Sequence, residues 1–392
     1  MSRLAIAVLA LLMLFGTALA AKSDDFTAEQ LVLLKLFGTD PITADMFAPS
    51  FLAQVSMEQV LEVFSKTRAA VGPPVSIERS GRGSYLVRTA TYQVPVDLGL
   101  DQSGRVAALL LHPPSPNFAD VTDVLAAIDG LKGKISYLVT RDGAVLYARG
   151  QTRPIAVGSA FKLGVLAVVA DEIAAGRLRW DTVVPLGAGE VSLPSGVLQT
   201  MPVGSPLTVH TLAAFMISQS DNTATDVLVD LVGRDKVAKK LGVDFVLKTA
   251  EFFKLKADPA LRLRFTSADA PGQLKAAGEM AALPLPDAAD VGAPLDPGIE
   301  WYLPASRLCS LIGEVAGLDV FEINAGVARK QDWAHIAFKG GSEVGVASLT
   351  SALVDKAGHR YCVTLTENDR QALDEQRVTA LYGALLGKLV AP

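Results

Sequence analysis

The sequence has few of the residues that build metal centres and disulfide frameworks. It carries 2 cysteines and 4 histidines in 392 residues, too few cysteines for a disulfide scaffold or a closed four-cysteine zinc site. It contains no H-x-H or H-E-x-x-H pair, so the histidine spacing of a metallohydrolase is missing as well. We therefore expect no metal and no other cofactor.

An excess of basic residues is also missing. The 36 Lys and Arg residues against 41 Asp and Glu residues give a net charge of −5, which argues against a nucleic-acid partner held by a cationic surface. Half of the residues are hydrophobic, and 33 glycines and 21 prolines are scattered along the chain, so most of it should fold. At about 150 residues per domain, the length indicates two domains or one large domain with an extension.

The N-terminus has the pattern of a secretory signal. Arg3 precedes an uncharged stretch from Leu4 to Ala21, and Ala18-Leu19-Ala20 offers the small residues that signal peptidase accepts. We predict a signal peptide over residues 1–20 and a mature protein that is secreted or periplasmic, with no stable membrane anchor. An uncleaved anchor is the alternative, because about 18 apolar residues lie at the lower limit for crossing a bilayer.

Residues 24–113 combine two kinds of pattern. Apolar residues first recur at helical spacing. Then Tyr85–Val96 predicts one long strand, and Val106–Leu111 predicts its antiparallel partner across a turn at 101–104. This order indicates a small α+β domain. The proline-rich residues 114–117 cannot continue either kind of element and predict a linker.

Residues 118–392 have strand patterns at both ends and a mainly helical middle. Two strands, Lys134–Thr140 and Ala144–Arg149, follow a first helix. Three more strands are expected before the last helix, over 333–339, 344–354 and 360–366. This order predicts an antiparallel sheet whose first and last helices cover one face, with an all-helical insertion on the other side.

A first motif, Ser159-Ala160-Phe161-Lys162, opens an apolar helical stretch that ends at Gly176. Ser159 would lie at the N-terminus of a buried helix, where backbone N–H groups and the helix dipole stabilise an oxyanion. Lys162 follows one turn later, so its amine could reach the Ser159 hydroxyl and, with a pKa lowered by burial, accept its proton. One Ser-x-x-Lys is also expected by chance in a chain of this length, so the motif alone decides nothing.

A second motif, Ser220-Asp221-Asn222, lies between two helical stretches. The Ser220 hydroxyl could relay a proton to a leaving group, and the Asn222 amide could hold a substrate carbonyl. The same residue types are favoured helix caps, so a purely structural role is the alternative.

A third motif, Lys339-Gly340-Gly341-Ser342, follows a predicted strand that ends at Lys339. The two glycines would leave a strand edge bare for an extended substrate, and the N–H near Ser342 could donate to an oxyanion. Lys339 could attract a substrate carboxylate. An ordinary bulge or turn with a solvated lysine is the alternative.

In this order, the three motifs resemble the S-x-x-K, S-D-N and K-T-G signature of penicillin-binding proteins and class A β-lactamases. The resemblance covers about residues 117–392 and implies a five-stranded antiparallel sheet with an all-helical subdomain. It implies that Ser159 is the acylating nucleophile, Lys162 its base and Ser220 the proton relay. The electrostatic anchor and the substrate-binding residues would be Lys339, Asn222, Gly340, Gly341 and Ser342.

The sequence departs from that signature in two places. Gly340 stands where the signature has threonine, and Ser342 could replace the missing hydroxyl. Class A enzymes also carry a glutamate after S-D-N that activates the deacylating water, but no glutamate occurs between Val232 and Thr249. Glu251 is the nearest candidate, although a carboxylate at a helix start also has a simple electrostatic explanation.

The chain is similar to two-domain family members in which a small domain, like nuclear transport factor 2 (NTF2) or ketosteroid isomerase, precedes a β-lactamase-like domain without that glutamate. One described type is a cephalosporin esterase. We therefore predict a secreted serine hydrolase whose small-molecule substrate is a β-lactam or a related ester or amide. The alternatives are a D-Ala-D-Ala peptidase acting on peptidoglycan and a non-catalytic cell-wall-binding module.

Three further residues have mainly structural explanations. Cys309 and Cys362 could pair outside the cytoplasm, but each lies in an apolar run that favours a free buried thiol, so the pairing stays open. His335 falls on the same strand face as Lys339, where a packed or hydrogen-bonded histidine is the expectation.

Overall fold

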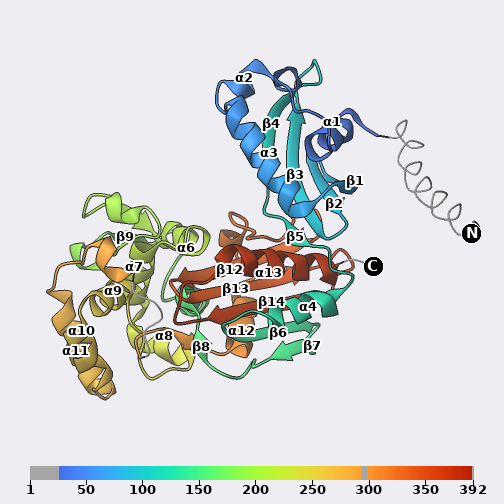
Figure 1. Cartoon of the computed structure of the whole chain (residues 1–392). Helices are drawn as coiled ribbons and strands as arrows, with labels where there is room; N and C mark the ends of the chain where they lie inside the picture. Colours follow the sequence, from blue (N-terminus) through green and yellow to red (C-terminus); the bar gives the residue numbers. More distant parts are fainter. Residues whose placement is uncertain (1–25, 293–297, 391–392) are drawn as a thin grey trace, which may run out of the picture. The chain divides into compact units, whose positions relative to one another are not determined.

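The computed structural model describes residues 26–292 and 298–390, and the chain divides into two compact units between Ala119 and Asp120 (Figure 1). The predicted signal peptide, residues 1–20, lies outside the described residues. Within the described ranges, no helix has both the length and the apolar character needed to cross a membrane.

The first unit places three helices before an antiparallel sheet. Its helices are α1 (Ala28–Phe37), α2 (Pro49–Leu52) and α3 (Met57–Val71). Its strands are β1 (Pro74–Gly81), β2 (Ser84–Thr89), β3 (Tyr92–Leu100), β4 (Val106–Leu111) and β5 (Ser115–Pro116). The sheet order is β1-β2-β3-β4, with β5 on β3. Thr27 and Ser56 begin α1 and α3 with capping boxes that satisfy exposed backbone N–H groups.

The structure corrects two predictions in this unit. Tyr85–Val96 is not one strand but the hairpin of β2 and β3, in which these two residues pair with each other. Thr89 makes the turn, because its hydroxyl accepts hydrogen bonds from the Thr91 and Tyr92 N–H groups. The predicted linker, residues 114–117, instead contains β5, and Ser115 is buried.

The second unit contains the predicted five-stranded antiparallel sheet, in the order β12-β13-β14-β6-β7. Its strands are β6 (Lys134–Arg141), β7 (Ala144–Arg149), β12 (His335–Glu343), β13 (Val346–Val354) and β14 (Arg360–Asn368). The first and last helices, α4 (Val121–Asp129) and α13 (Glu375–Leu389), lie side by side in front of this sheet (Figure 1).

The helical part of this unit comes between β7 and β12 in the sequence. It contains α5 (Lys162–Ala174), α6 (Val209–Ser218), α7 (Asn222–Val232), α8 (Arg234–Leu241), α9 (Thr249–Ala257), α10 (Pro259–Thr266), α11 (Ala270–Ala281) and α12 (Ala305–Val315). Four short strands form two pairs. β8 (Ile155–Ala156) pairs with β11 (Tyr302–Leu303), and β9 (Val183–Pro185) pairs with β10 (Pro206–Thr208). Helix α5 is the centre of the main core, and nine of its residues are buried.

Cys309 of α12 and Cys362 of β14 form a disulfide, with 5.7 Å between their Cα atoms. The pairing, which the sequence left open, is therefore present, although the apolar runs around the two cysteines favoured free thiols. The apolar runs around both cysteines are the faces on which α12 packs against the sheet, so the tertiary fold makes neighbours of two residues that are 53 positions apart.

Candidate active site

Ser159 lies at the start of the central helix, on one turn of 3-10 helix, η3 (Gly158–Phe161), that leads into α5. Gly158 has φ +49°, a left-handed conformation that favours glycine. Ser159 is half-buried and lines a cavity of about 660 Å³. The predicted position at a helix N-terminus is found, with the 3-10 turn inserted before the α-helix.

The glycines of the third motif bring strand β12 against this turn. A Cβ atom on Gly341 would lie 2.2 Å from Val157 O and 2.7 Å from Ser159 N, whereas a Cβ on Gly340 would meet the Phe338 ring at 3.2 Å. The strand does not end at Lys339 as predicted, because the glycines pair in register with β13 and β12 continues to Glu343. Close backbone packing, and not a bulge, therefore requires Gly341.

Lys162 turns its ammonium away from bulk water. The residue is fully buried, and its Nζ donates to Ser220 O at 2.5 Å, Asn222 Oδ1 at 2.7 Å and Ser220 Oγ at 3.2 Å. Within the described chain, no hydrogen bond joins it to Ser159 Oγ. Burial, and next the charge of Lys339, hold the pKa of Lys162 well below its usual value.

The loop between α6 and α7 aims Ser220 at both lysines. Ser220 has φ +57°, which is uncommon for a residue with a side chain. Its Oγ accepts from Lys162 Nζ at 3.2 Å and from Lys339 Nζ at 3.0 Å. A hydroxyl that accepts from two amines keeps its own proton available to a third partner.

The predicted capping role belongs to the middle residue of this motif. Asp221 Oδ1 accepts from Ala224 N at 2.8 Å, as an N-cap of α7. Its Oδ2 accepts from the N–H groups of Val197 and Leu198, at 2.7 and 2.9 Å. The structural and the functional interpretation of the motif therefore apply to different residues, because Asp221 fixes the loop while Ser220 and Asn222 face Lys162.

Lys339 closes the polar cluster from the sheet. Its Nζ also donates to Gly340 O at 2.5 Å, and burial lowers its pKa to about 7. Two buried amines that share one hydroxyl repel each other when both are charged. The charge of Lys339 therefore favours the neutral form of Lys162, and a neutral amine can accept a proton from a nucleophile.

Aromatic side chains form one wall of the cavity. Trp301 stacks on Phe161 with 4.3 Å between ring centroids and tilts against Phe252 at 4.5 Å. The indole N–H donates to Leu247 O at 3.1 Å. Trp301 and Phe252 line the cavity, which adds apolar contact area beside the polar cluster.

A second polar network, which the sequence motifs did not indicate, lies behind Asn222. Asp226 is fully buried and accepts from Thr249 N, Thr249 Oγ1 and Ala250 N, at 2.7 to 2.9 Å. Burial raises its pKa to about 7. Thr249 Oγ1 also lies 3.2 Å from Asn222 O. A carboxylate inside the apolar stretch of α7 was the one sequence signal for this network.

The two remaining candidates do not reach the cavity. Glu251 forms the N-terminal capping box of α9, and its carboxylate accepts from the Arg234 guanidinium at 2.6 and 2.8 Å. Its explanation as a helix-start carboxylate therefore holds, and the idea of a deacylating base at this residue is wrong. His335 Nε2 lies 2.7 Å from Ala316 O, as expected for a hydrogen-bonded strand histidine. Among the described residues, no group of three His, Cys, Asp or Glu side chains is placed to hold a metal ion.

Comparisons with known proteins place this unit among β-lactamase-like folds. Residues 118–276 match the model of the β-lactamase enzyme family. The structure is similar to the β-lactamase from Sphaerobacter thermophilus DSM 20745, with a TM-score of 0.50 and 21% identity over 70% of this chain and 99% of that one. PBP-A has a TM-score of 0.48 at 16% identity, over 69% of this chain and 94% of that one.

An ancestral (GNCA) class A β-lactamase has a TM-score of 0.49 and 15% identity, over 69% of this chain and 98% of that one. No curated protein matches the chain. At these identities the structural likeness concerns the fold, and the family match concerns residues 118–276. The second unit therefore has the fold of a β-lactamase, and residues 118–276 match the β-lactamase enzyme family model.

Proposed function

We propose that this protein is a serine hydrolase that forms an acyl-enzyme on Ser159 with a β-lactam or a related ester or amide. Lys162 acts as the base, Ser220 relays the proton and Lys339 attracts the substrate carboxylate. Asn222 and the backbone of Gly340, Gly341 and Ser342 bind the substrate. We also propose that the protein is secreted or periplasmic, and that the first unit is an NTF2-like domain.

One observation carries the catalytic proposal: the Nζ atoms of Lys162 and Lys339 both donate to Ser220 Oγ, at 3.2 and 3.0 Å. In the proposed acylation, Ser159 Oγ attacks the carbonyl carbon and its proton passes to neutral Lys162. The Oγ–C bond forms and the bond from carbon to the leaving nitrogen or oxygen breaks. The proton then reaches the leaving atom through Ser220 Oγ, so that Lys162 returns to its neutral form.

The surroundings of Glu251 favour slow release of the acyl group. The charged residues among its described lining are Lys339, Glu343 and Glu375, and Glu251 is not one of them. No carboxylate at the start of α9 is therefore free to activate water, because Glu251 is held by Arg234. This supports a peptidase or esterase acting through a long-lived acyl-enzyme as the second candidate.

The disulfide between Cys309 and Cys362 supports the proposed location, since disulfides persist in oxidising compartments. N-terminal sequencing of the protein exported by a bacterial host tests it. Mature chains that begin close to residue 21 are expected, and chains that stay unprocessed in the cytoplasm would contradict secretion.

Intact-protein mass spectrometry after mixing with a chromogenic cephalosporin tests the acyl-enzyme, with absorbance followed in parallel. We expect a mass increase on the wild-type chain and none on Ser159→Ala. Turnover that depends on Ser159 would support a β-lactamase, and a stable adduct would support the peptidase or esterase. Failure of cephalosporins, penicillins and simple esters alike to form an adduct would overturn the proposal in favour of a binding module.

A further inference from the structure

We infer that Glu343 selects substrates that carry a cationic group on the side chain of the acyl part. This inference rests on the proposed acyl-enzyme function and concerns the end of the cavity away from Lys339. Neither the sequence motifs nor the family match assigns a role to Glu343.

The strand geometry directs Glu343 toward the nucleophile side of β12. Side chains alternate along a strand, so residues 339, 341 and 343 share one face. Lys339 contacts Ser220 from that face, and Gly341 packs on the Ser159 turn. Glu343 lines the same cavity as Ser159, four residues and roughly 13 Å along the strand from Lys339.

The two oxygens of the Glu343 carboxylate have different surroundings. Oε2 accepts from Lys256 Nζ at 2.5 Å. Oε1 is buried and has no hydrogen-bond partner among the described residues, while the side chain as a whole keeps 16% exposure. A buried acceptor without a donor is unfavourable. A small rotation of the carboxylate would offer this oxygen to a donor in the cavity.

The ion pair with Lys256 holds one oxygen of the Glu343 carboxylate in place. Lys256 Nζ also lies 3.5 Å from Glu300 Oε1, so one ammonium serves two carboxylates. It sits over the Phe252 ring as well, at 5.1 Å from the centroid. Glu343 therefore brings a carboxylate to this wall of the cavity, whereas Lys339 brings an amine to the other.

Opposite charges at the two ends favour a zwitterionic substrate. The substrate carboxylate would meet Lys339, and an ammonium on the acyl side chain would meet Glu343 Oε1. A neutral side chain would leave that oxygen unpaired, and an anionic one would be repelled. The chemical class selected is thus an acyl donor with a primary amine near its scissile carbonyl.

Three penicillins that differ at one carbon test this inference: ampicillin with an ammonium there, benzylpenicillin with hydrogen and carbenicillin with a carboxylate. The acylation rate constant of each is measured by intact-protein mass spectrometry at slightly acidic pH. We expect each step in this series to slow acylation by about tenfold, the effect of one partly desolvated charge contact. Glu343→Gln should bring the three rates to within about threefold of one another, because the amide keeps the shape and loses the charge.

Glu375→Gln is the matched control, since Glu375 also lines the cavity but is exposed. It should preserve the ratio between ampicillin and carbenicillin. Equal rates for all three penicillins on the wild type, or a ratio lost in Glu375→Gln and kept in Glu343→Gln, would overturn the inference. If Glu343→Gln does not fold, the wild-type series alone decides. A wild type that no penicillin acylates would contradict the proposed function itself, and so the two failures are distinguishable.

Discussion

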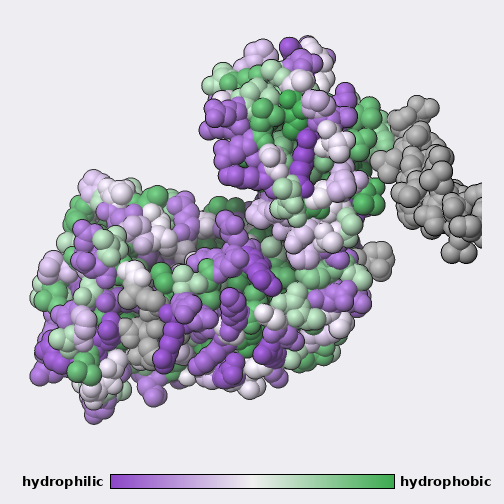
Figure 2. All heavy atoms as spheres, in the orientation of Figure 1, coloured by the Kyte–Doolittle hydropathy of each residue, from purple (hydrophilic) through white to green (hydrophobic). Residues whose placement is uncertain are grey.

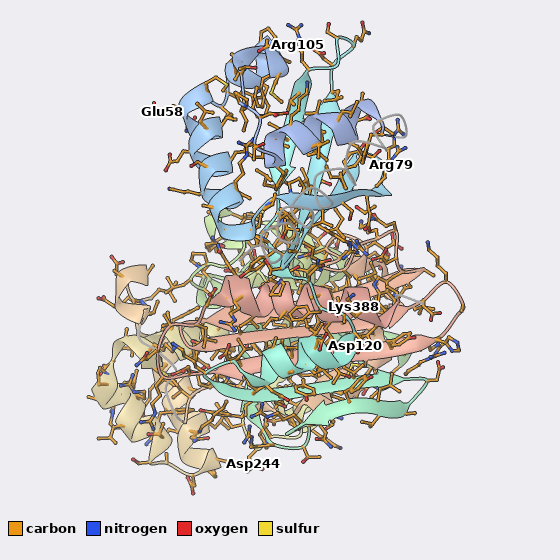
Figure 3. All side chains as sticks on the ribbon, turned by 45° about the vertical axis from the view of Figure 1, so that its right-hand side comes forward. Glu58, Arg79, Arg105, Asp120, Asp244 and Lys388 are labelled. Atoms are coloured by element: carbon orange, nitrogen blue, oxygen red, sulfur yellow. A yellow bond between two sulfur atoms is a disulfide. The ribbon has the colours of Figure 1, made fainter. Side chains whose placement is uncertain are left out.

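The two units build antiparallel sheets covered by helices, yet they differ in where they place their charges. The faces seen in Figure 2 mix hydrophilic and hydrophobic residues on both units. In the described part of the first unit, the buried polar side chains are Thr89 and Ser115, neither of them charged. Its charged residues, such as Glu58 and Arg79, project from the surface (Figure 3). The second unit buries Lys162, Lys339 and Asp226, each at a desolvation cost.

A serine hydroxyl has different partners in the two units. In the first, Ser84 Oγ and His112 Nε2 both contact Asp97, at 2.6 and 2.9 Å, and the His112 and Asp97 side chains are 43% and 47% exposed. Ser84 Oγ donates to Asp97 Oδ1 and His112 Nε2 contacts Asp97 Oδ2, so the partner of this serine is an exposed carboxylate. In the second unit, Ser220 lies between two buried amines. Burial and orientation, more than residue type, separate a surface cluster from a reactive one.

The largest expected effect comes from removing a buried amine. Lys162→Met should lower the acylation rate constant by about 10³-fold, because it removes the general base. The exposed Lys66 of the first unit, paired with Glu62 at 2.6 Å, supplies the control. Lys66→Met should leave acylation unchanged and shift the free energy of unfolding by less than about 0.5 kcal/mol. Mass spectrometry measures the acylation rate constant, and urea denaturation measures the free energy of unfolding. Acylation of Lys162→Met within tenfold of the wild type would contradict its role.

The disulfide should stabilise the second unit alone. Closing a loop of 53 residues contributes about 4 kcal/mol in the chain-entropy account. Replacing both cysteines by serine should therefore lower the urea midpoint reported by Trp180, Trp301 and Trp333, the 3 tryptophans of the chain, all in the second unit. Hydrogen exchange in the first unit, which contains no cysteine, is the control. Equal loss of protection in both units would contradict this independence.

The adjacent glycines of β12 should respond differently to the same methyl group. Gly341→Ala must displace the backbone around Ser159, since its Cβ would overlap Val157 O. An ångström of displacement slows acylation by about 10²-fold. Gly340→Ala only presses on the Phe338 ring and should stay within about threefold of the wild type. Equal rates for the two variants would show that η3 does not depend on this close contact.

Two buried groups of the second unit should give its stability opposite dependences on pH. Burial raises the pKa of Asp226 from 3.8 to about 7, so the native state holds this proton more tightly than the unfolded state. The free energy of unfolding then falls as pH rises from about 4 to 7. Burial lowers the pKa of Lys339 from 10.5 to about 7. Here the unfolded state holds the proton more tightly, and stability rises from about pH 7 upward.

Each group contributes up to about 1.4 kcal/mol per pH unit. Urea denaturation followed by tryptophan fluorescence measures the free energy of unfolding at each pH. Asp226→Asn should weaken the fall of this free energy between about pH 4 and 7. Lys339→Met should weaken its rise above about pH 7. Variants whose stability depends on pH in the same way as that of the wild type would contradict the assignment of these groups.

Sequence patterns predicted the second unit better than the first. The order of strands and helices after residue 118 was confirmed, because buried elements have strong apolar patterns. The pattern does not separate β2 from β3, since the turn at Ala90 and Thr91 lacks the glycine or proline that usually indicates a turn. The register of β12 through Gly340 and Gly341 was missed for the opposite reason, because paired glycines resemble a break.

By itself, the sequence determined which residue types are available for acyl transfer and in what order they occur, because spacing along a helix or strand is a local property. Only the tertiary structure decided which of them meet. It placed Ser220 between Lys162 and Lys339 and joined Cys309 to Cys362. It also paired Glu251 with Arg234 and placed Glu343 in the cavity wall. Contacts between distant segments, and the burial that shifts the pKa of the two lysines, depend on packing that no local pattern specifies.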